Sequence, residues 1–91
     1  IILEREFLRG EINKIEGFSA FPSEANFLLV RLPSQINMPK FMEELNKRGI
    51  IVRNVTGLIG LKHNYIRVTV GVKQENRKFI SVLRKIIESK K

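Results

Sequence analysis

Three segments of the chain carry apolar residues every three or four positions, which is the spacing of a single helix face. They are residues 1–15, residues 39–48 and the stretch from Val72 to Ile87. Gly49 follows the second segment directly after two basic residues, which is typical of a helix end. In the third segment the basic residues fall outside an apolar stripe that consists of Val72, Asn76, Phe79, Ile80, Leu83, Ile86 and Ile87.

Strands are predicted where β-branched and other apolar residues gather in short runs. Residues 25–32 are apolar on both faces and end at Pro33, which suits a largely buried strand. Residues 50–55 and 65–70 form two β-branched runs, and residues 18–21 add a short candidate strand. This order predicts an α+β fold, in which helices pack on one face of a small, mainly antiparallel sheet of about three to four strands.

The face of such a sheet that points away from the helices would expose apolar side chains to solvent. Residues 25–32 and 50–55 are apolar on both sides, so apolar area stays exposed unless another domain or chain packs there. The chain also starts directly in periodic sequence, with no capping residue before its first helix. We therefore expect residues 1–91 to form a single domain that is a fragment of a larger protein, with residues 1–15 as the end of an interdomain helix.

Length and composition narrow the class of protein. A chain of 91 residues is one compact domain at most. The absence of cysteine excludes a disulfide framework, a thiolate metal site and a cysteine nucleophile. No apolar run reaches the roughly 18 residues of a membrane span. A cytoplasmic location is compatible with this composition.

The charge is strongly positive, with 17 Lys and Arg against 9 acidic residues and a net charge of +8. Residues 73–91 hold five of these eight charges, so the surplus fits a solvated helix exterior or a phosphate-binding patch. A small basic nucleic-acid-binding or regulatory module therefore stays an alternative. The Gly57–Gly60 segment has the G-x-x-G spacing of a KH loop, but it lies between two strands and favours a turn.

Two arginines stand inside apolar strands, Arg53 in IIVRNV and Arg67 in YIRVTVG. A buried arginine needs a carboxylate or phosphate partner, because its planar guanidinium grips such anions in a bidentate manner. One interpretation is an anion clamp formed by the pair. The other is that both point outward on an exposed sheet face and pair with surface acids.

The remaining polar candidates indicate little chemistry. His63 stands in a polar loop, and one histidine without cysteine or a second histidine makes neither a metal site nor a catalytic triad. Asn26 opens a strand, where an asparagine side chain caps a turn or bonds a nearby loop backbone. The sequence thus predicts no catalytic residue and no metal ligand in this chain.

Three blocks resemble a known family: FPSEANFLLVRLP at 21–33, RGIIVRNV at 48–55 and YIRVTVGVKQENRKFISVL at 65–83. In this order and spacing they look like the C-terminal small domain of the histidinol-phosphate aminotransferase family, within the fold type I pyridoxal-phosphate enzymes. The resemblance spans nearly the whole chain. Threonine-phosphate decarboxylases share the layout, and the VTVG after Arg67 is more similar to the histidinol-phosphate branch.

The resemblance implies roles for the two arginines, with Arg67 on the substrate carboxylate and Arg53 on the substrate phosphate. It implies a parent enzyme that uses pyridoxal phosphate to move an amino group between histidinol phosphate and 2-oxoglutarate in histidine biosynthesis. The family's cofactor lysine and cofactor ligands lie in a large domain, so the chain alone is expected to bind no cofactor and to be inactive. A cytoplasmic homodimer that binds no nucleic acid and no membrane is expected for the parent.

Overall fold

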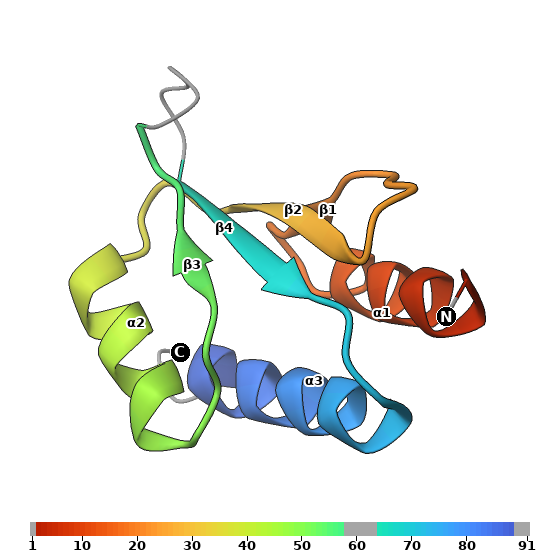
Figure 1. Cartoon of the computed structure of the whole chain (residues 1–91). Coiled ribbons are helices and arrows are strands. Elements are labelled where there is room, and N and C mark those ends of the chain that lie inside the picture. Colours follow the sequence, from red (N-terminus) through yellow and green to blue (C-terminus); the bar gives the residue numbers. More distant parts are fainter. Residues whose placement is uncertain (1, 58–63, 89–91) are drawn as a thin grey trace.

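A computed structural model describes residues 2–57 and 64–88, apart from the side chain of Ile2. Three helices and four strands follow one another along these residues (Figure 1). Their bounds are α1 Ile2–Asn13, β1 Ser19–Ala20, β2 Phe27–Leu32, α2 Met38–Lys47, β3 Arg53–Asn54, β4 Asn64–Thr69 and α3 Lys73–Glu88.

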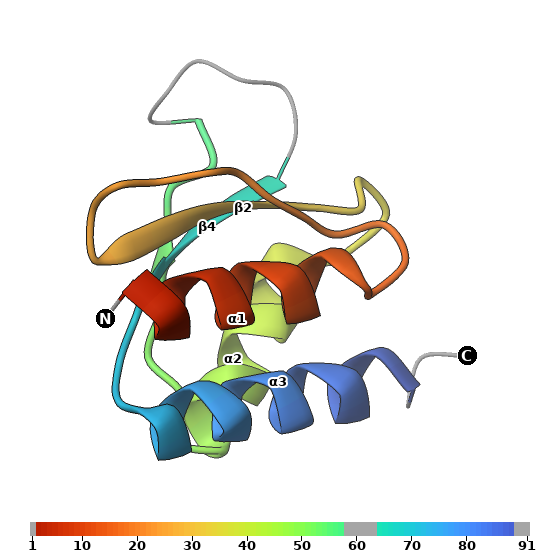
Figure 2. The ribbon, with the colours of Figure 1, turned by 90° about the vertical axis from the view of Figure 1, so that its right-hand side faces the viewer.

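The four strands form one antiparallel sheet in the order β1-β2-β4-β3. Its centre is the pair β2 and β4, whose register runs from Phe27 opposite Thr69 to Leu32 opposite Asn64. All three helices lie against the same side of the sheet (Figure 2). The described residues therefore confirm the predicted α+β class, with helices on one face of an antiparallel sheet.

The hydrophobic core lies between the sheet and the helices. Leu28 and Val30 of β2 and Ile66 and Val68 of β4 point toward the helices and are almost completely buried. Burial of each such side chain contributes about 1.5 to 3 kcal/mol, so this contact holds the layers together. The helices supply Leu8, Ile12, Phe41, Leu45, Phe79, Leu83 and Ile86 to the same cluster.

Local sequence sets the two ends of α2. The side chain of Asn37 accepts a hydrogen bond from the backbone N–H of Lys40 at 3.1 Å, and Pro39 stands in the first turn, where its missing N–H is not needed. Gly49, with φ of +79°, follows the last turn. The helix predicted at residues 39–48 is thus confirmed to within one residue at each end.

The strand predicted at residues 50–55 is wrong over its first half, because only Arg53–Asn54 pairs with β4. The backbone N–H of Ile50 instead donates to the carbonyl of Leu45 at 2.9 Å, which completes the end of α2. Ile50 is therefore engaged with the helix, and the chain meets β4 only at residue 53. Ile51, between these two points, is 88% exposed.

Val72 is also placed differently from the prediction, since it is 63% exposed and precedes α3. Its backbone N–H donates to the Glu75 carboxylate at 3.1 Å, which is one half of a capping box. The rest of the predicted apolar stripe faces inward. Asn76, Phe79, Ile80, Leu83 and Ile86 are buried, and Ile87 is half-buried.

Candidate anion-binding site

The sheet surface opposite the helices, which we call the open face, mixes apolar side chains with arginines. Alternation along each strand and the register between strands determine which side chains it carries. No glutamate stands on any of the four strands. The open face consists of Ser19, Phe27, Leu29, Arg31, Arg53, Tyr65, Arg67 and Thr69.

Arg53 and Arg67, the predicted site residues, lie directly opposite each other on β3 and β4. Both are exposed, and neither forms an ion pair with an acid among the described residues. Like charges at directly opposed strand positions destabilise a sheet. An anion bound between the two guanidinium groups would relieve this repulsion. The alternative interpretation is right that both arginines are exposed on an outward sheet face, but among the described residues no surface acid pairs with either of them.

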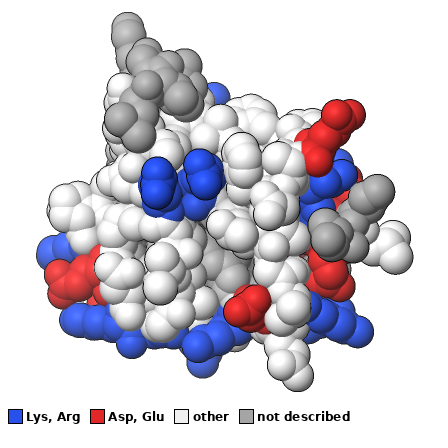
Figure 3. Space-filling model, in the orientation of Figure 1, with Lys and Arg blue, Asp and Glu red and all other residues white. Residues whose placement is uncertain are grey.

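A ring beneath Arg67 and a shallow pocket beside it complete the site. The guanidinium carbon of Arg67 lies 4.6 Å from the centre of the Phe27 ring, a cation–π contact that orients the side chain. In Figure 3 basic side chains stand among uncharged atoms in the middle of the face that is shown. Both arginines line a pocket of about 460 Å³, together with Ile51, Val52, Asn54 and Thr69.

Arg31 and Phe27 belong to the open face but were not singled out from the sequence. Arg31 is exposed and has no ion pair among the described residues, and its cross-strand neighbour is Tyr65. The ring of Tyr65 stacks on Phe21 with centroids 6.3 Å apart. Two signals pointed to them in the sequence: Arg31 is a charge inside an apolar run, and Phe27 lies an even number of residues from it in the same strand, which puts both on one face.

The other sequence candidates lie at the margins of the site or beyond the described residues. The side chain of Asn26 is exposed without a hydrogen bond in this part of the chain, and its backbone carbonyl accepts the Val70 N–H at 2.8 Å. The predicted side-chain bond is therefore not formed among the described residues, and Asn26 contributes its backbone carbonyl instead. His63 and residues 58–60 of the G-x-x-G segment fall outside the described residues.

The basic exterior of α3 is partly occupied by contacts with α1, which weakens the phosphate-patch interpretation. Arg84 forms an ion pair with Glu11 at 3.3 Å, and the guanidinium of Arg77 lies 4.5 Å from the centre of the Phe7 ring. A hydrogen bond from Lys14 lowers the pKa of Glu11 below its ordinary value. The predicted exposure of the helix exterior is confirmed for Lys73, Arg77, Lys78, Arg84 and Lys85.

Two further kinds of site find no support within residues 2–57 and 64–88. No group of three or more histidine or acidic side chains there is arranged to hold a metal ion. In the same ranges no helix has the length and apolar character needed to cross a bilayer.

Sequence relatives were found over almost the whole chain. Histidinol-phosphate aminotransferase of Methanopyrus kandleri is 42% identical over 89 residues, which are 97% of this chain and 23% of that protein. The enzyme of the same name from Aquifex aeolicus is 44% identical over 89 residues, 98% of this chain and 24% of its own length. The chain thus spans about a quarter of the length of the curated relatives it matches.

Solved structures of related enzymes have the same fold as this chain. A histidinol-phosphate aminotransferase from Clostridium acetobutylicum matches with a TM-score of 0.87 and 31% identity, covering 98% of this chain and 27% of that one. L-threonine-O-3-phosphate decarboxylase from Porphyromonas gingivalis matches with a TM-score of 0.80 and 25% identity, over 96% of this chain and 27% of its own. The sequence model of the family described as aminotransferase class I and II matches residues 1–83. This chain belongs to the class I and II aminotransferase family.

Proposed function

We propose that this chain is the C-terminal small domain of a pyridoxal-phosphate-dependent aminotransferase. The whole protein would transfer an amino group between histidinol phosphate and 2-oxoglutarate, a step of histidine biosynthesis. The observation that carries the proposal is the Arg53 and Arg67 pair, because two opposed arginines that no described acid pairs with are suited to an anionic substrate. The names of the curated relatives support the choice of reaction.

The chemistry of the two substrates fits a pair of adjacent arginines. Histidinol phosphate carries a phosphate and no carboxylate, whereas 2-oxoglutarate carries two carboxylates. We assign a carboxylate to Arg67 and the phosphate to Arg53. Directly opposed residues of an antiparallel pair have Cα atoms about 4.5 to 5.5 Å apart, so an anion bound by one arginine lies in the field of the other.

The cofactor would be held outside this chain. Pyridoxal phosphate supplies the electron sink for amino transfer when it is bound to a lysine. Such a lysine is activated by desolvation or by a neighbouring cation, and in this chain by itself Lys14, Lys40, Lys47, Lys73, Lys78 and Lys85 are all exposed. The described lysines do not fit the cofactor, so we assign its binding and the catalytic residues to the remaining three quarters of the relatives' length. We further expect the whole protein to be a cytoplasmic homodimer, and the chain alone to be inactive.

A phosphorylated amino-acid decarboxylase is the second candidate function. A decarboxylase from Sulfurospirillum multivorans matches with a TM-score of 0.85 and 30% identity over 93% of this chain and 24% of its own, beside the Porphyromonas gingivalis enzyme. Threonine phosphate carries both a carboxylate and a phosphate, so it also suits two arginines. Assays of the whole enzyme for amino transfer to 2-oxoglutarate and for release of carbon dioxide from threonine phosphate separate the two functions.

Replacement of Arg67 tests the site directly. In the whole enzyme Arg67→Ala is expected to lower kcat/KM for 2-oxoglutarate roughly 30- to 1000-fold. This corresponds to a loss of about 2 to 4 kcal/mol of transition-state stabilisation, because a charge-assisted bidentate contact is removed. Arg48→Ala is the matched control. Arg48 directly follows α2 and pairs with Glu44 of that helix, away from the candidate site. Nearly unchanged kinetics for Arg67→Ala would remove this residue from the site.

Replacement of Arg53 tests recognition of the phosphate. The Arg53→Ala enzyme should lose its preference for histidinol phosphate over unphosphorylated histidinol, because the missing guanidinium contacts the phosphate. Arg53→Lys keeps the positive charge and should retain part of that preference. The ratio of the two kcat/KM values measures the effect, and a ratio unchanged in Arg53→Ala contradicts the assignment.

A further inference from the structure

Asn76 is the only buried side chain with a charge or an amide among the described residues, with 2% of its surface exposed. Its Nδ2 donates to Glu4 Oε1 at 3.0 Å and to the Gly71 carbonyl at 2.9 Å, and its Oδ1 accepts from the Gly71 N–H at 2.9 Å. A buried amide left unpaired costs about 1 to 3 kcal/mol, so these bonds fix the groups that they join. Asn76 therefore ties the first turn of α1 to the turn between β4 and α3.

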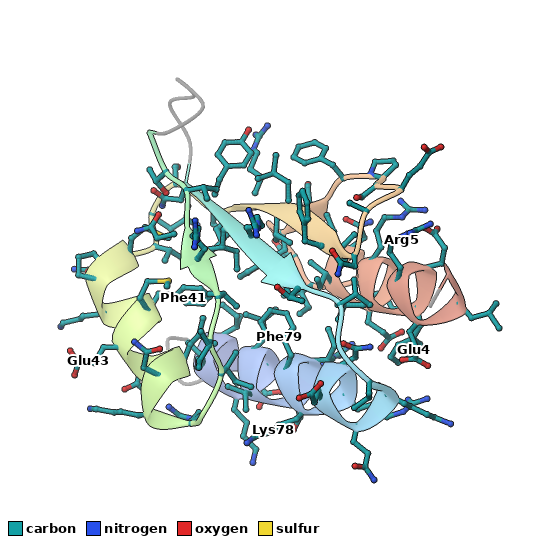
Figure 4. All side chains as sticks on the ribbon, viewed as in Figure 1. Glu4, Arg5, Phe41, Glu43, Lys78 and Phe79 are labelled. Atoms are coloured by element: carbon teal, nitrogen blue, oxygen red, sulfur yellow. The ribbon has the colours of Figure 1, made fainter. Side chains whose placement is uncertain are left out.

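The next residue of α1 holds a second loop. Arg5 Nη1 donates to the carbonyl of Ala25 at 3.3 Å, just before β2 begins. The two loops are also joined to each other, because the Val70 N–H donates to the Asn26 carbonyl at 2.8 Å. Figure 4 shows Glu4 and Arg5 at the same end of α1. Arg5 thus contacts the loop that enters β2 directly, whereas Glu4 reaches the turn that leaves β4 only through the Asn76 side chain.

Both contacts act close to the anion-binding site. Phe27, the first residue of β2, follows Asn26 directly, and Val70 lies three residues after Arg67. The Val70–Asn26 bond continues the pairing in which Phe27 and Thr69 are partners. Since the guanidinium of Arg67 rests on the Phe27 ring, a relative shift of these two strand ends changes the direction of Arg67.

We propose that Glu4 and Arg5 are positioning residues for Arg67. They hold the adjoining ends of β2 and β4 together, so that the guanidinium is oriented before a substrate anion arrives. An orientation set in advance reduces the conformational entropy that binding must remove. This inference rests on the proposed function, because it takes Arg67 to be the carboxylate ligand.

Glu4 is the more informative residue to change. Arg5 Nε is buried with no hydrogen-bond partner among the described residues, so a substitution of Arg5 would remove an orphan donor together with the contact. Glu6 provides a matched control on the same helix, with the same charge. Its carboxylate pairs with Arg9 within α1 at 2.7 Å and, among the described residues, bonds neither Asn76 nor the two loops.

In the full-length enzyme, Glu4→Ala is expected to raise KM for 2-oxoglutarate about 3- to 10-fold, while kcat stays within about twofold. Glu4→Gln keeps an oxygen that accepts from Asn76 and should restore the wild-type KM. Glu6→Ala should change neither constant. Amide hydrogen exchange at Val70 and Gly71 should become faster in Glu4→Ala and not in Glu6→Ala, because only the former loosens this junction.

A KM for Glu4→Ala that equals the KM for Glu6→Ala overturns the positioning role. Unchanged kinetics for Arg67→Ala would also overturn the inference, because Arg67 would then not be in the site. The proposed function fails by a different result, the absence of amino transfer to 2-oxoglutarate by the whole wild-type enzyme, so the two failures are distinguishable. Should Glu4→Ala not fold, Glu4→Asp takes its place, because the shorter side chain stretches the bond to Asn76. An increased KM in Glu4→Asp supports the inference, and an unchanged KM overturns it.

Discussion

Gly17 is a position at which any side chain would cause strain. Its φ is +88°, and a Cβ placed there would lie 2.6 Å from the Cγ of Pro33. Gly17→Ala is expected to lower the free energy of unfolding by about 1 to 3 kcal/mol, because backbone strain and overpacking add. Urea unfolding of the purified chain, followed by circular dichroism, measures the change.

Gly10 is the matched control for this prediction, since it is an exposed glycine inside α1, and no described atom outside the local helix backbone lies within 4 Å of an added Cβ. Gly10→Ala should raise the free energy of unfolding by about 0.5 to 1 kcal/mol, because alanine favours a helix interior. Equal effects of the two substitutions would show that the contact with Pro33 has no influence on stability.

Also at this scale, the sequence predicted part of the candidate site. Arg53 and Arg67 stood out because a charge inside an apolar run is unusual. Arg31 carries the same signal, a charge inside the apolar run FLLVRL, and was not singled out. Phe27 carries no such signal, because residues 25–32 are apolar on both faces and the alternation indicates no outward side. Only the register with β4 shows that Phe27 lies beneath Arg67, and register depends on contacts between residues far apart in sequence.

Among the secondary-structure elements, α2 depends most clearly on one capping residue. Asn37→Ala removes the acceptor for the Lys40 N–H and should lower the free energy of unfolding by about 0.5 to 2 kcal/mol. Asn46→Ala, at an exposed position within the same helix, should be neutral or slightly stabilising. Urea denaturation of both variants tests this, and equal losses would contradict a capping role for Asn37.

Elements whose ends have local causes were predicted best. The capping residue and the glycine after α2 are both visible in the sequence, and the bounds came within one residue. Residues 50–55 have the composition of a strand, yet half of them stay unpaired because Ile50 completes the end of α2. Composition describes what a segment can form, whereas the neighbouring helix decides how much of it reaches the sheet.

At the scale of the whole molecule, the helices cover one side of the sheet and leave three arginines on the other. A positive charge without an acid partner attracts anions, and at 0.1 M salt screening limits this attraction to a distance of about 10 Å. Arg31→Gln in the whole enzyme should therefore weaken the binding of 2-oxoglutarate about two- to fivefold at low salt, with little effect near 0.5 M salt. Binding measured by titration across a salt series checks this.

Arg48→Gln is the control for that experiment, because it removes an equal charge from a residue that pairs with Glu44 at 2.6 Å. It should leave the salt dependence of binding unchanged. A salt dependence that Arg31→Gln does not alter would mean that Arg31 contributes nothing to the field at the site.

The two opposed arginines stand on strands that are paired to different extents. β4 is fixed to β2 along six register pairs, whereas β3 meets β4 at only two. Strand ends with little pairing open and shift at low free-energy cost. We therefore expect Arg67 to keep its position more firmly than Arg53. In the proposed function this difference would place the fixed contact at the carboxylate and the adjustable contact at the phosphate.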